Sequence, residues 1–203
     1  MNSIIFENKK IIPSKIVCVG RNYLEHIEEL GNVKHDEMII FSKPNSSISK
    51  ELYFFSEDTR YEGELCFLIK NKKIAGLGFG LDLTKENEQK KSPNLPWERC
   101  KAFDGAAIFS NFVPFDGDIK KTFLELHIND KLVQVSAHEL MIYKPCEILN
   151  EIQTFMSLED GDIIMSGTPK GVGSYKINDI FLGKIFYENK LLTEASWTVK
   201  AKP

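Results

Sequence analysis

The sequence has no long hydrophobic run, no excess of basic charge and no cysteine pair with metal-binding spacing. Its 26 lysine and arginine residues are outnumbered by 29 acidic ones, and Glu86 and Glu88 interrupt the longest basic cluster, at 85–91. The first ten residues lack the apolar core of a secretion signal, and no later run approaches membrane-spanning length. We therefore expect a soluble, cytoplasmic protein whose partners include neither nucleic acid nor a membrane.

The cysteines are too widely spaced to indicate a disulfide framework; they are Cys18, Cys66, Cys100 and Cys146. The first two lie in apolar, strand-like runs, where a free thiol usually acts as a small buried hydrophobe. Cys100 stands beside Lys101 and could be a nucleophile, but no histidine lies nearby in the sequence to activate its thiol. We therefore favour free cysteines without a catalytic role.

Short segments rich in β-branched and aromatic residues dominate the sequence, which predicts a mixed α+β fold that is mainly β. The expected strands span residues 16–19, 38–41, 52–55, 65–69, 74–82, 123–128, 132–135, 162–165, 180–182, 185–187 and 195–199. The pairs Asn129-Asp130 and Glu188-Asn189 have the composition of tight hairpin turns. A length of 203 residues, 42% of them hydrophobic, suits one core, so we expect a single domain over residues 1–203.

Helices are expected to be few and short. Residues 23–30 have apolar side chains at helical spacing before a Gly-Asn pair, and Thr84 could cap a helix that runs through residue 91. Pro145 opens a stronger helix, in which we expect an apolar stripe in the core, formed by Ile148, Leu149, Ile152, Phe155 and Met156. The polar segments 43–50 and 86–96 are predicted to be loops, and either could act as a lid.

Three acidic residues are placed where they could hold a metal ion. Glu62 and Glu64 precede an expected buried strand, and side chains two residues apart share one face of a strand. Asp82 lies near the end of the next expected strand, so the three carboxylates meet if the two strands are neighbours. Their repulsion favours a cation, and oxygen-only ligands favour Mg²⁺, Mn²⁺ or Ca²⁺ over zinc. The alternative is a solvated strand face with exposed glutamates.

Other side chains could take part in chemistry. His26 and Glu29 are three residues apart on the expected helix, so the carboxylate can orient the imidazole as a general base for water; a surface pair is the alternative. Arg21 lies in the preceding strand-to-helix loop, a frequent place for functional groups. Lys101 is flanked by bulky apolar residues and could stabilise an anionic intermediate, whereas a surface lysine with a buried stem is the alternative.

A loop of small residues, SGTPKGVG at 166–173, follows an expected strand. Its backbone amides and the Thr168 hydroxyl could hold a carboxylate or a phosphate. The spacing is not that of a P-loop, and a plain turn would also explain the glycines.

Five segments together resemble the fumarylacetoacetate hydrolase family, and they occur in the order VCVGRNYLEHIEELGN, YEGEL, LDLT, LPWERCKAFD and MSGTPKGVG. The chain is most similar to the short bacterial acylpyruvase and oxaloacetate-acting members. This resemblance implies a β-roll with a few short helices, usually assembled as a homodimer. It also implies a divalent metal, commonly Mg²⁺ or Mn²⁺, that is held by Glu62, Glu64 and Asp82.

The resemblance implies roles for the residues around this metal. His26 and Glu29 match a pair that activates water, and Lys101 matches a lysine that stabilises the developing enolate. The Gly-Thr-Pro loop matches the family's loop for the substrate carboxylate. The expected substrate-binding residues are Arg21, Gln89, Gly167 and Thr168.

The sequence departs from the family pattern at two places. Similar proteins have an arginine soon after the metal-binding aspartate, where this chain has Glu86. The reversed charge should weaken binding of an anionic substrate unless Lys85, Arg21 or Lys43 compensates. The connection at 70–75 is also shorter than in similar proteins, which predicts a sheet that is uncovered there or covered by a dimer partner.

We therefore expect a metal-dependent enzyme that acts on a small 2-oxo acid, either hydrolysing a carbon–carbon bond in an acylpyruvate or decarboxylating oxaloacetate. Keto–enol tautomerisation of oxaloacetate, an isomerase reaction, is an alternative that needs no nucleophile. A catalytically degraded module that only binds metal and carboxylate is another, suggested by Glu86 and the short connection.

Overall fold

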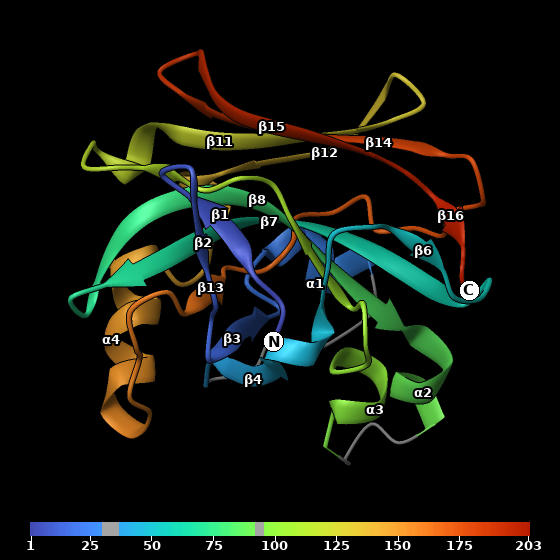
Figure 1. Ribbon diagram of the computed structural model, residues 1–203, viewed down its shortest axis with the longest axis horizontal. Coiled ribbons are helices and arrows are strands. Elements are labelled where there is room, and N and C mark those ends of the chain that lie inside the picture. Colours follow the sequence, from blue (N-terminus) through green and yellow to red (C-terminus); the bar gives the residue numbers. More distant parts are fainter. Residues whose placement is uncertain (30–36, 92–95) are drawn as a thin grey trace.

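The computed structural model describes residues 1–29, 37–91 and 96–203, and it confirms a mainly β fold in which a four-stranded sheet lies over a curled larger sheet (Figure 1). The strands are β1 Ile4–Phe6, β2 Lys9–Ile11, β3 Lys15–Gly20, β4 Ile39–Pro44, β5 Ile48–Ser49, β6 Tyr53–Phe54, β7 Thr59–Lys70, β8 Lys73–Lys85, β9 Ala107–Phe109, β10 Val113–Pro114, β11 Thr122–Ile128, β12 Lys131–Ala137, β13 Ile163–Met165, β14 Ile180–Tyr187, β15 Lys190–Thr198 and β16 Lys200–Ala201. The α-helices are α1 Leu24–Glu29, α2 Glu86–Lys91, α3 Glu98–Lys101 and α4 Pro145–Phe155. No helix in these described ranges is long and apolar enough to cross a membrane.

The long antiparallel pair β7 and β8 forms the centre of the larger sheet. The strand order in that sheet is β4-β3-β13-β7-β8-β9-β5, with β10 also paired to β8, and the order in the smaller sheet is β12-β11-β14-β15. The β7–β8 register runs from Thr59 opposite Lys85 to Lys70 opposite Lys73. The predicted neighbouring strands therefore exist, and both are longer than the sequence indicated.

Side chains on β7 alternate between two cores, as expected for a strand that is buried on both faces. Leu65 and Phe67 belong to the core shared with the smaller sheet, whereas Cys66 and Leu68 belong to a second core beyond the larger sheet. Gly63 lets the two sheets approach closely, since a Cβ there would lie 3.0 Å from Gln134 Oε1 and 3.2 Å from Leu126, both on the smaller sheet. By the same alternation, the side chains of Glu62 and Glu64 lie on the same face of β7 as those of Cys66 and Leu68.

Several local predictions are confirmed. The two predicted hairpin turns have left-handed backbone at both residues, with φ of 49° and 64° at Asn129 and Asp130 and 48° and 66° at Glu188 and Asn189. These angles fit a two-residue turn between twisted strands. Helix α1 is present, although its predicted end at 30–32 lies outside the described residues. The cysteines are free.

The prediction that Thr84 caps a helix is wrong. Thr84 is buried inside β8, and its hydroxyl donates a hydrogen bond of 2.5 Å to Glu62 Oε1. The chain stays extended to Lys85, and α2 begins only at Glu86. Phe155 also departs from the predicted apolar stripe, because it is 59% exposed at the end of α4 while Ile148 and Ile152 are fully buried.

The polar segment 43–50 is not a lid. It continues from β4 through a 3-10 turn, Asn45–Ser47, into β5, and the side chains of Lys43 and Ser47 are completely buried. Asn45 Nδ2 donates hydrogen bonds to the carbonyl oxygens of Asn2 (2.9 Å) and Pro13 (2.8 Å). These distant partners satisfy the Asn45 side-chain amide, so the segment packs as part of the core edge, although the buried Ser47 hydroxyl has no hydrogen-bond partner among the described residues.

The shortened 70–75 connection is a tight β7–β8 turn that the chain itself supports. Asn71 N donates to Asp160 Oδ1 at 2.7 Å, and Gln153 Nε2, from α4, donates to the carbonyl of Lys72 at 2.9 Å. The turn therefore has contacts within its own chain, which the sequence analysis did not foresee.

Candidate active site

Three carboxylates converge at one end of the β7–β8 pair. Glu62 and Glu64 share a face of β7, and Asp82 on β8 lies directly opposite Glu62 in the antiparallel register. A ligand oxygen from each of the three lies within 4.8 Å of the others. Glu64 and Asp82 are buried, with 2% and 0% exposure, so the predicted convergence is confirmed and the exposed-face alternative is wrong.

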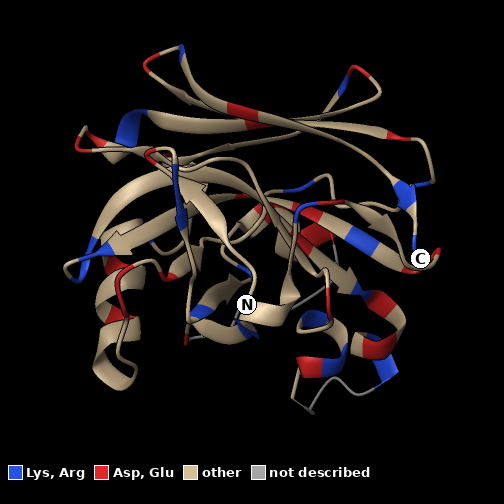
Figure 2. Cartoon of the chain, in the orientation of Figure 1, with Lys and Arg blue, Asp and Glu red and all other residues tan. Residues whose placement is uncertain are grey.

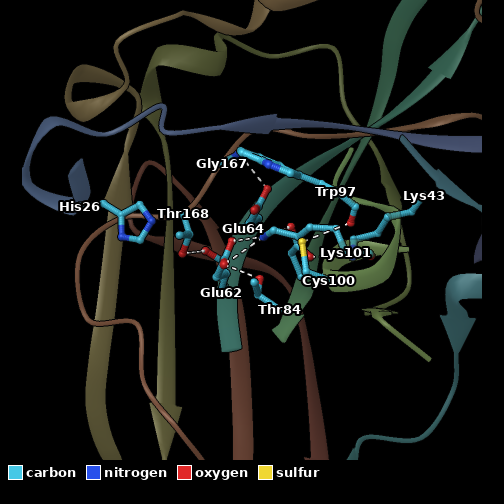
Figure 3. Close-up of polar contacts among 12 residues, drawn as sticks. His26, Lys43, Glu62, Glu64, Thr84, Trp97, Cys100, Lys101, Gly167 and Thr168 are labelled. Carbon is cyan, nitrogen blue, oxygen red and sulfur yellow. Dashed lines mark hydrogen bonds and ion pairs between the residues drawn. The ribbon is translucent and has the colours of Figure 1, made fainter. Parts of the chain in front are cut away.

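Lys101 enters this cluster from α3. Its Nζ lies 2.9 and 2.8 Å from the two oxygens of Glu62 and 2.8 Å from Asp82 Oδ2 (Figure 3). Burial alone would lower the pKa of the Lys101 ammonium, but Asp82 and Glu62 raise it above its usual value. With 4% exposure, Lys101 is a buried ammonium aimed at the carboxylates, and the alternative of a surface lysine is wrong.

Glu64 is the least compensated of the three acids. Burial raises the pKa of its carboxyl well above the usual range, and the neighbouring Asp82 and Glu62 carboxylates raise it further. The Gly167 amide opposes this effect by donating a 2.7 Å hydrogen bond to Glu64 Oε2. The loop predicted to hold substrate thus also positions a carboxylate of the cluster.

A second lysine, which the sequence analysis named only as a possible compensating charge, lies beneath the cluster. Lys43 is completely buried, and its Nζ lies 2.7 Å from Asp82 Oδ1 and donates to the carbonyl of Lys101. It therefore ties β4 to both Asp82 and the end of α3. Cys100, next to this carbonyl, donates to the carbonyl of Trp97 at 3.2 Å, and burial raises the pKa of its thiol, which agrees with a non-catalytic role.

The donor set fits a hard divalent cation. The three residues offer only carboxylate oxygens, which suit Mg²⁺, Mn²⁺ or Ca²⁺. Asp82 Oδ1 is buried and accepts no well-directed hydrogen bond from the described residues, despite its ion pair with Lys43. A buried carboxylate oxygen in that state is suited to act as a metal ligand.

His26 and Glu29 form the predicted pair. His26 Nδ1 lies 3.3 Å from Glu29 Oε2; His26 is buried, with 5% exposure, whereas Glu29 lies at the surface and its side chain is 33% exposed. The two oxygens of Glu29 also accept from the Gly171 amide, at 3.0 and 3.2 Å. An Nδ1–H donated to Glu29 leaves Nε2 as the free base of the ring.

The Thr168 hydroxyl is held by a residue that the sequence analysis missed. Gln134, on β12, is 1% exposed, and its Nε2 donates to Thr168 Oγ1 at 2.9 Å while its Oε1 accepts from the Gly63 amide at 2.9 Å. Thr168 in turn donates to the carbonyl of Gly63 at 3.0 Å. No local motif marks Gln134; its only signal is a polar residue at an inward position of a strand.

The glycine at 167 is required by its surroundings. Its φ of 94° is left-handed, and a Cβ there would lie 2.8 Å from the Cβ of Asn22 and 3.0 Å from the carbonyl of Val19. Asn22 fixes the same loop by donating to the carbonyl of Ser166 at 2.8 Å. The strand-to-helix loop after β3 and the Gly-Thr-Pro loop are therefore packed against each other.

Two adjoining cavities open over this site. The inner one, about 40 Å³, is lined by Asp82, His26, Lys101 and Thr168 among others. The outer one, about 360 Å³, reaches Glu29, and the residues that border both are Arg21, Glu62, Gln89 and Trp97. In Figure 3, His26 and Thr168 lie on one side of the carboxylates and Lys101 on the other. The predicted catalytic and substrate-binding residues thus line one or both of these adjoining cavities, except Gly167, which lines neither.

The reversed charge at Glu86 is compensated, but by other residues than expected. Glu86 Oε2 lies 2.6 Å from an Arg60 nitrogen and Oε1 lies 2.6 Å from Lys90 Nζ. Lys43 is directed at Asp82, and Lys85 Nζ lies over the Phe103 ring, 4.4 Å from its centre. Neither lysine pairs with Glu86, and their expected compensation in substrate binding stays a prediction.

The fold and this carboxylate cluster define a β-roll protein with a candidate metal centre, and comparison with known proteins gives its family. A model of the fumarylacetoacetate (FAA) hydrolase C-terminal family matches residues 15–199, so the chain belongs to this family. It is 35% identical over 187 residues to oxaloacetate tautomerase YcgM of Escherichia coli K12, covering 82% of this chain and 85% of that protein. It is 33% identical over 183 residues to the mitochondrial oxaloacetate decarboxylase of Dictyostelium discoideum, with 80% and 84% coverage.

A solved structure supports the same assignment. Fumarylpyruvate hydrolase from Pseudomonas aeruginosa, in complex with Mn²⁺ and pyruvate, matches this chain with a TM-score of 0.89 at 26% identity. The match covers 99% of this chain and 96% of that structure. The family resemblance and the β-roll expected from the sequence are therefore confirmed.

Proposed function

We propose that this chain is a divalent-metal-dependent enzyme that acts on a small 2-oxo acid, by hydrolysing a carbon–carbon bond in an acylpyruvate or by decarboxylating oxaloacetate. The observation that carries the proposal is the convergence of Glu62, Glu64 and Asp82 beside a cavity that Lys101 and His26 also line. The Mn²⁺ and pyruvate bound to the related fumarylpyruvate hydrolase support the same metal and substrate class.

Glu62, Glu64 and Asp82 would hold a Mg²⁺ or Mn²⁺ ion. When bound, that ion supplies Lewis-acid polarisation of the 2-oxo group and its carboxylate. The Lys101 ammonium, fixed by Glu62 and Asp82, is placed to stabilise negative charge that develops on the enolate oxygen. Because its own position is held by hydrogen bonds, little reorganisation is needed during the reaction.

Hydrolysis needs a base, and the His26–Glu29 pair provides one. Nε2 of His26 takes a proton from water, and the resulting hydroxide adds to the distal carbonyl carbon. The bond between that carbon and the adjacent methylene then breaks, giving a carboxylic acid and a pyruvate enolate, which a proton converts to pyruvate. Thr168, Arg21 and Gln89 border the same space and would bind the substrate carboxylate and oxo groups.

Keto–enol tautomerisation of oxaloacetate is a second candidate, favoured by the 35% identity to the E. coli oxaloacetate tautomerase. Tautomerisation moves one proton between carbon and oxygen and requires no attack by water. Decarboxylation also proceeds without water, because the bond to the leaving CO₂ breaks directly to the enolate. His26 is therefore the residue whose importance differs between hydrolysis and the other reactions.

The test is turnover of acetylpyruvate and oxaloacetate with Mg²⁺ or Mn²⁺, separating loss of substrate, release of CO₂ and enol-to-keto conversion. We expect activity that disappears with a chelator and in Glu64→Ala. The products identify the reaction. For hydrolysis we expect a fall of about 10²–10⁴-fold in His26→Ala, whereas enol-to-keto conversion or CO₂ release that survives this substitution would favour tautomerisation or decarboxylation. Absence of turnover above Glu64→Ala in every assay would overturn the proposal and leave a binding module.

The remaining expectations stand as proposals. We propose that residues 1–203 form one catalytic domain and that it works as a homodimer in the cytoplasm. The match of a catalytic-family model to residues 15–199 supports the first part. Light scattering of the purified protein tests the second, since a monomeric mass would contradict it.

A further inference from the structure

Arg60, Glu86 and Lys90 form an ionic cluster at the border of the outer cavity. Arg60 Nη2 lies 2.6 Å from Glu86 Oε2, and Arg60 Nη1 donates a hydrogen bond of 2.8 Å to the carbonyl of Glu57. Lys90 Nζ lies 2.6 Å from Glu86 Oε1, one helical turn along α2. Figure 2 shows acidic and basic residues side by side on this helix. The Arg60 guanidinium is thus held from two sides.

The cluster lies on the same strand face as the candidate metal ligands. Arg60 is opposite Thr84 in the β7–β8 register, two pairs beyond Glu62 and Asp82. Residues two apart on a strand share a face and are separated by about 7 Å. That distance is comparable to the length of a four- or five-carbon dicarboxylate. A ligand held at the carboxylate cluster by one end would therefore present its other end near Arg60.

The charge of the cluster favours an anion. Two cations, Arg60 and Lys90, face one carboxylate, Glu86, which leaves one positive charge. The side chains of Arg60 and Glu86 are 26% and 21% exposed, whereas that of Lys90 is 68% exposed, so solvent screens the charge of Arg60 less than that of Lys90. A guanidinium has more N–H donors than these two contacts use, and its planar fork matches a carboxylate.

We propose that Arg60 is the specificity-determining residue for the far end of the substrate, and that it selects 2-oxo acids carrying a second carboxylate over those with an uncharged end. This inference rests on the proposed function of the same site. Glu86 fixes the guanidinium at the cavity border, while Lys90 offsets the charge of Glu86. The substrate class is then a dicarboxylic 2-oxo acid, of which oxaloacetate is the four-carbon case.

The test compares pairs of ligands that differ only at the far end. Binding of 2-oxoglutarate and of 2-oxopentanoate is measured by calorimetry in the presence of Mn²⁺, because neither has the reactive bond and neither requires turnover. The wild-type protein should bind the dicarboxylate more tightly. Arg60→Gln should weaken dicarboxylate binding about 10- to 100-fold and change monocarboxylate binding by less than about 3-fold, and Arg60→Lys should fall between.

The matched control is Lys121→Gln, which removes an exposed ion pair with Glu188 that has no part in the site. It should leave both ligands unchanged. Monocarboxylate binding shows at the same time that each variant is folded. Equal losses for the two ligands in Arg60→Gln, or no preference for the dicarboxylate in the wild type, would overturn the inference.

Failure of the proposed catalytic function can be distinguished from failure of the proposed role of Arg60. If no 2-oxo acid is turned over but Arg60→Gln still weakens only the dicarboxylate, the selectivity stands and the catalytic proposal does not. If turnover is found and Arg60→Gln lowers kcat/KM equally for oxaloacetate and acetylpyruvate, the catalytic proposal stands and the role of Arg60 is rejected.

Discussion

Glu62 lies directly opposite Asp82 in the antiparallel β7–β8 pair, and one Lys101 ammonium contacts both carboxylates. The backbone ladder of two long strands fixes this relationship, so the acids are held close despite their repulsion. Burial of Asp82 and of its flanking lysines, Lys43 and Lys101, limits the screening of their charges by water. The candidate metal centre is therefore a property of the sheet itself and not of a mobile loop.

Lys43 should contribute strongly to the stability of the fold, although it is not one of the predicted catalytic residues. Lys43→Met leaves Asp82 Oδ1 buried without its ion-pair partner, and we expect it to lower the free energy of unfolding by about 3 kcal/mol in a chelator. Urea denaturation measures this loss. Lys121→Met, which breaks a solvent-exposed pair, should lower the free energy of unfolding much less, because water screens that pair. Equal costs for the two variants would show that the buried pair is not stabilising.

Gln134 should act on both folding and activity. Gln134→Leu removes the partner of the Gly63 amide and of the Thr168 hydroxyl, and unsatisfied buried groups of this kind cost about 1–3 kcal/mol each. We expect a lower melting temperature and a kcat/KM reduced about tenfold, because Thr168 loses its orientation. Gln153→Leu removes a hydrogen bond from an exposed glutamine and should change neither. Normal activity in Gln134→Leu would contradict the positioning role.

Asp162 should make the protein acid-sensitive. Burial alone would raise the pKa of its carboxyl, but hydrogen bonds from Lys15, the Glu159 amide and Ser14 lower it below 3.8 overall. A carboxyl whose pKa is lowered on folding adds stability above its unfolded pKa, and this contribution is lost as the pH falls through the folded value. Asp162→Asn should therefore destabilise the protein at pH 7, by about 3 kcal/mol, and weaken the dependence on pH below 4.

Chemical denaturation between pH 2 and 7 measures how the free energy of unfolding falls with decreasing pH, which is the acid limb of the stability profile. Asp160→Asn is the matched control, because Asp160 accepts one exposed hydrogen bond, from Asn71. It should keep the acid limb of the wild type. An unchanged acid limb in Asp162→Asn would assign the pH dependence to other carboxylates.

The sequence was sufficient to predict the elements in which a pattern of apolar side chains repeats over several residues. The strands β7 and β8 are long and apolar, so their existence and the face shared by Glu62 and Glu64 follow from periodicity alone. Strands of two or three residues, such as β5, β9 and β10, are too short to show a period. The four-residue helix α3, which carries Lys101, was missed for the same reason.

The polar interior could not be predicted, because its partners are distant in sequence. Lys43 and Gln134 look like ordinary surface residues until β4 is placed beside Asp82 and β12 beside Gly63. The same holds for Arg60, whose partner Glu86 follows the next strand. Lys101 and His26 were proposed from their neighbours in the sequence and then matched to roles by resemblance to a family, and the structure shows that both are buried and shows their distances to Glu62 and Glu29.

Titration with Mn²⁺, followed by calorimetry, tests the central claim most directly. The account predicts one ion per chain in the wild type and an affinity at least about 100-fold lower in Glu64→Gln and in Asp82→Asn, a larger loss than an outer-shell substitution usually gives. Glu125→Gln, which alters a partly exposed pair with His127, should bind Mn²⁺ as the wild type does. Wild-type protein that takes up no Mn²⁺, or variants at 64 and 82 that bind it unchanged, would contradict the account.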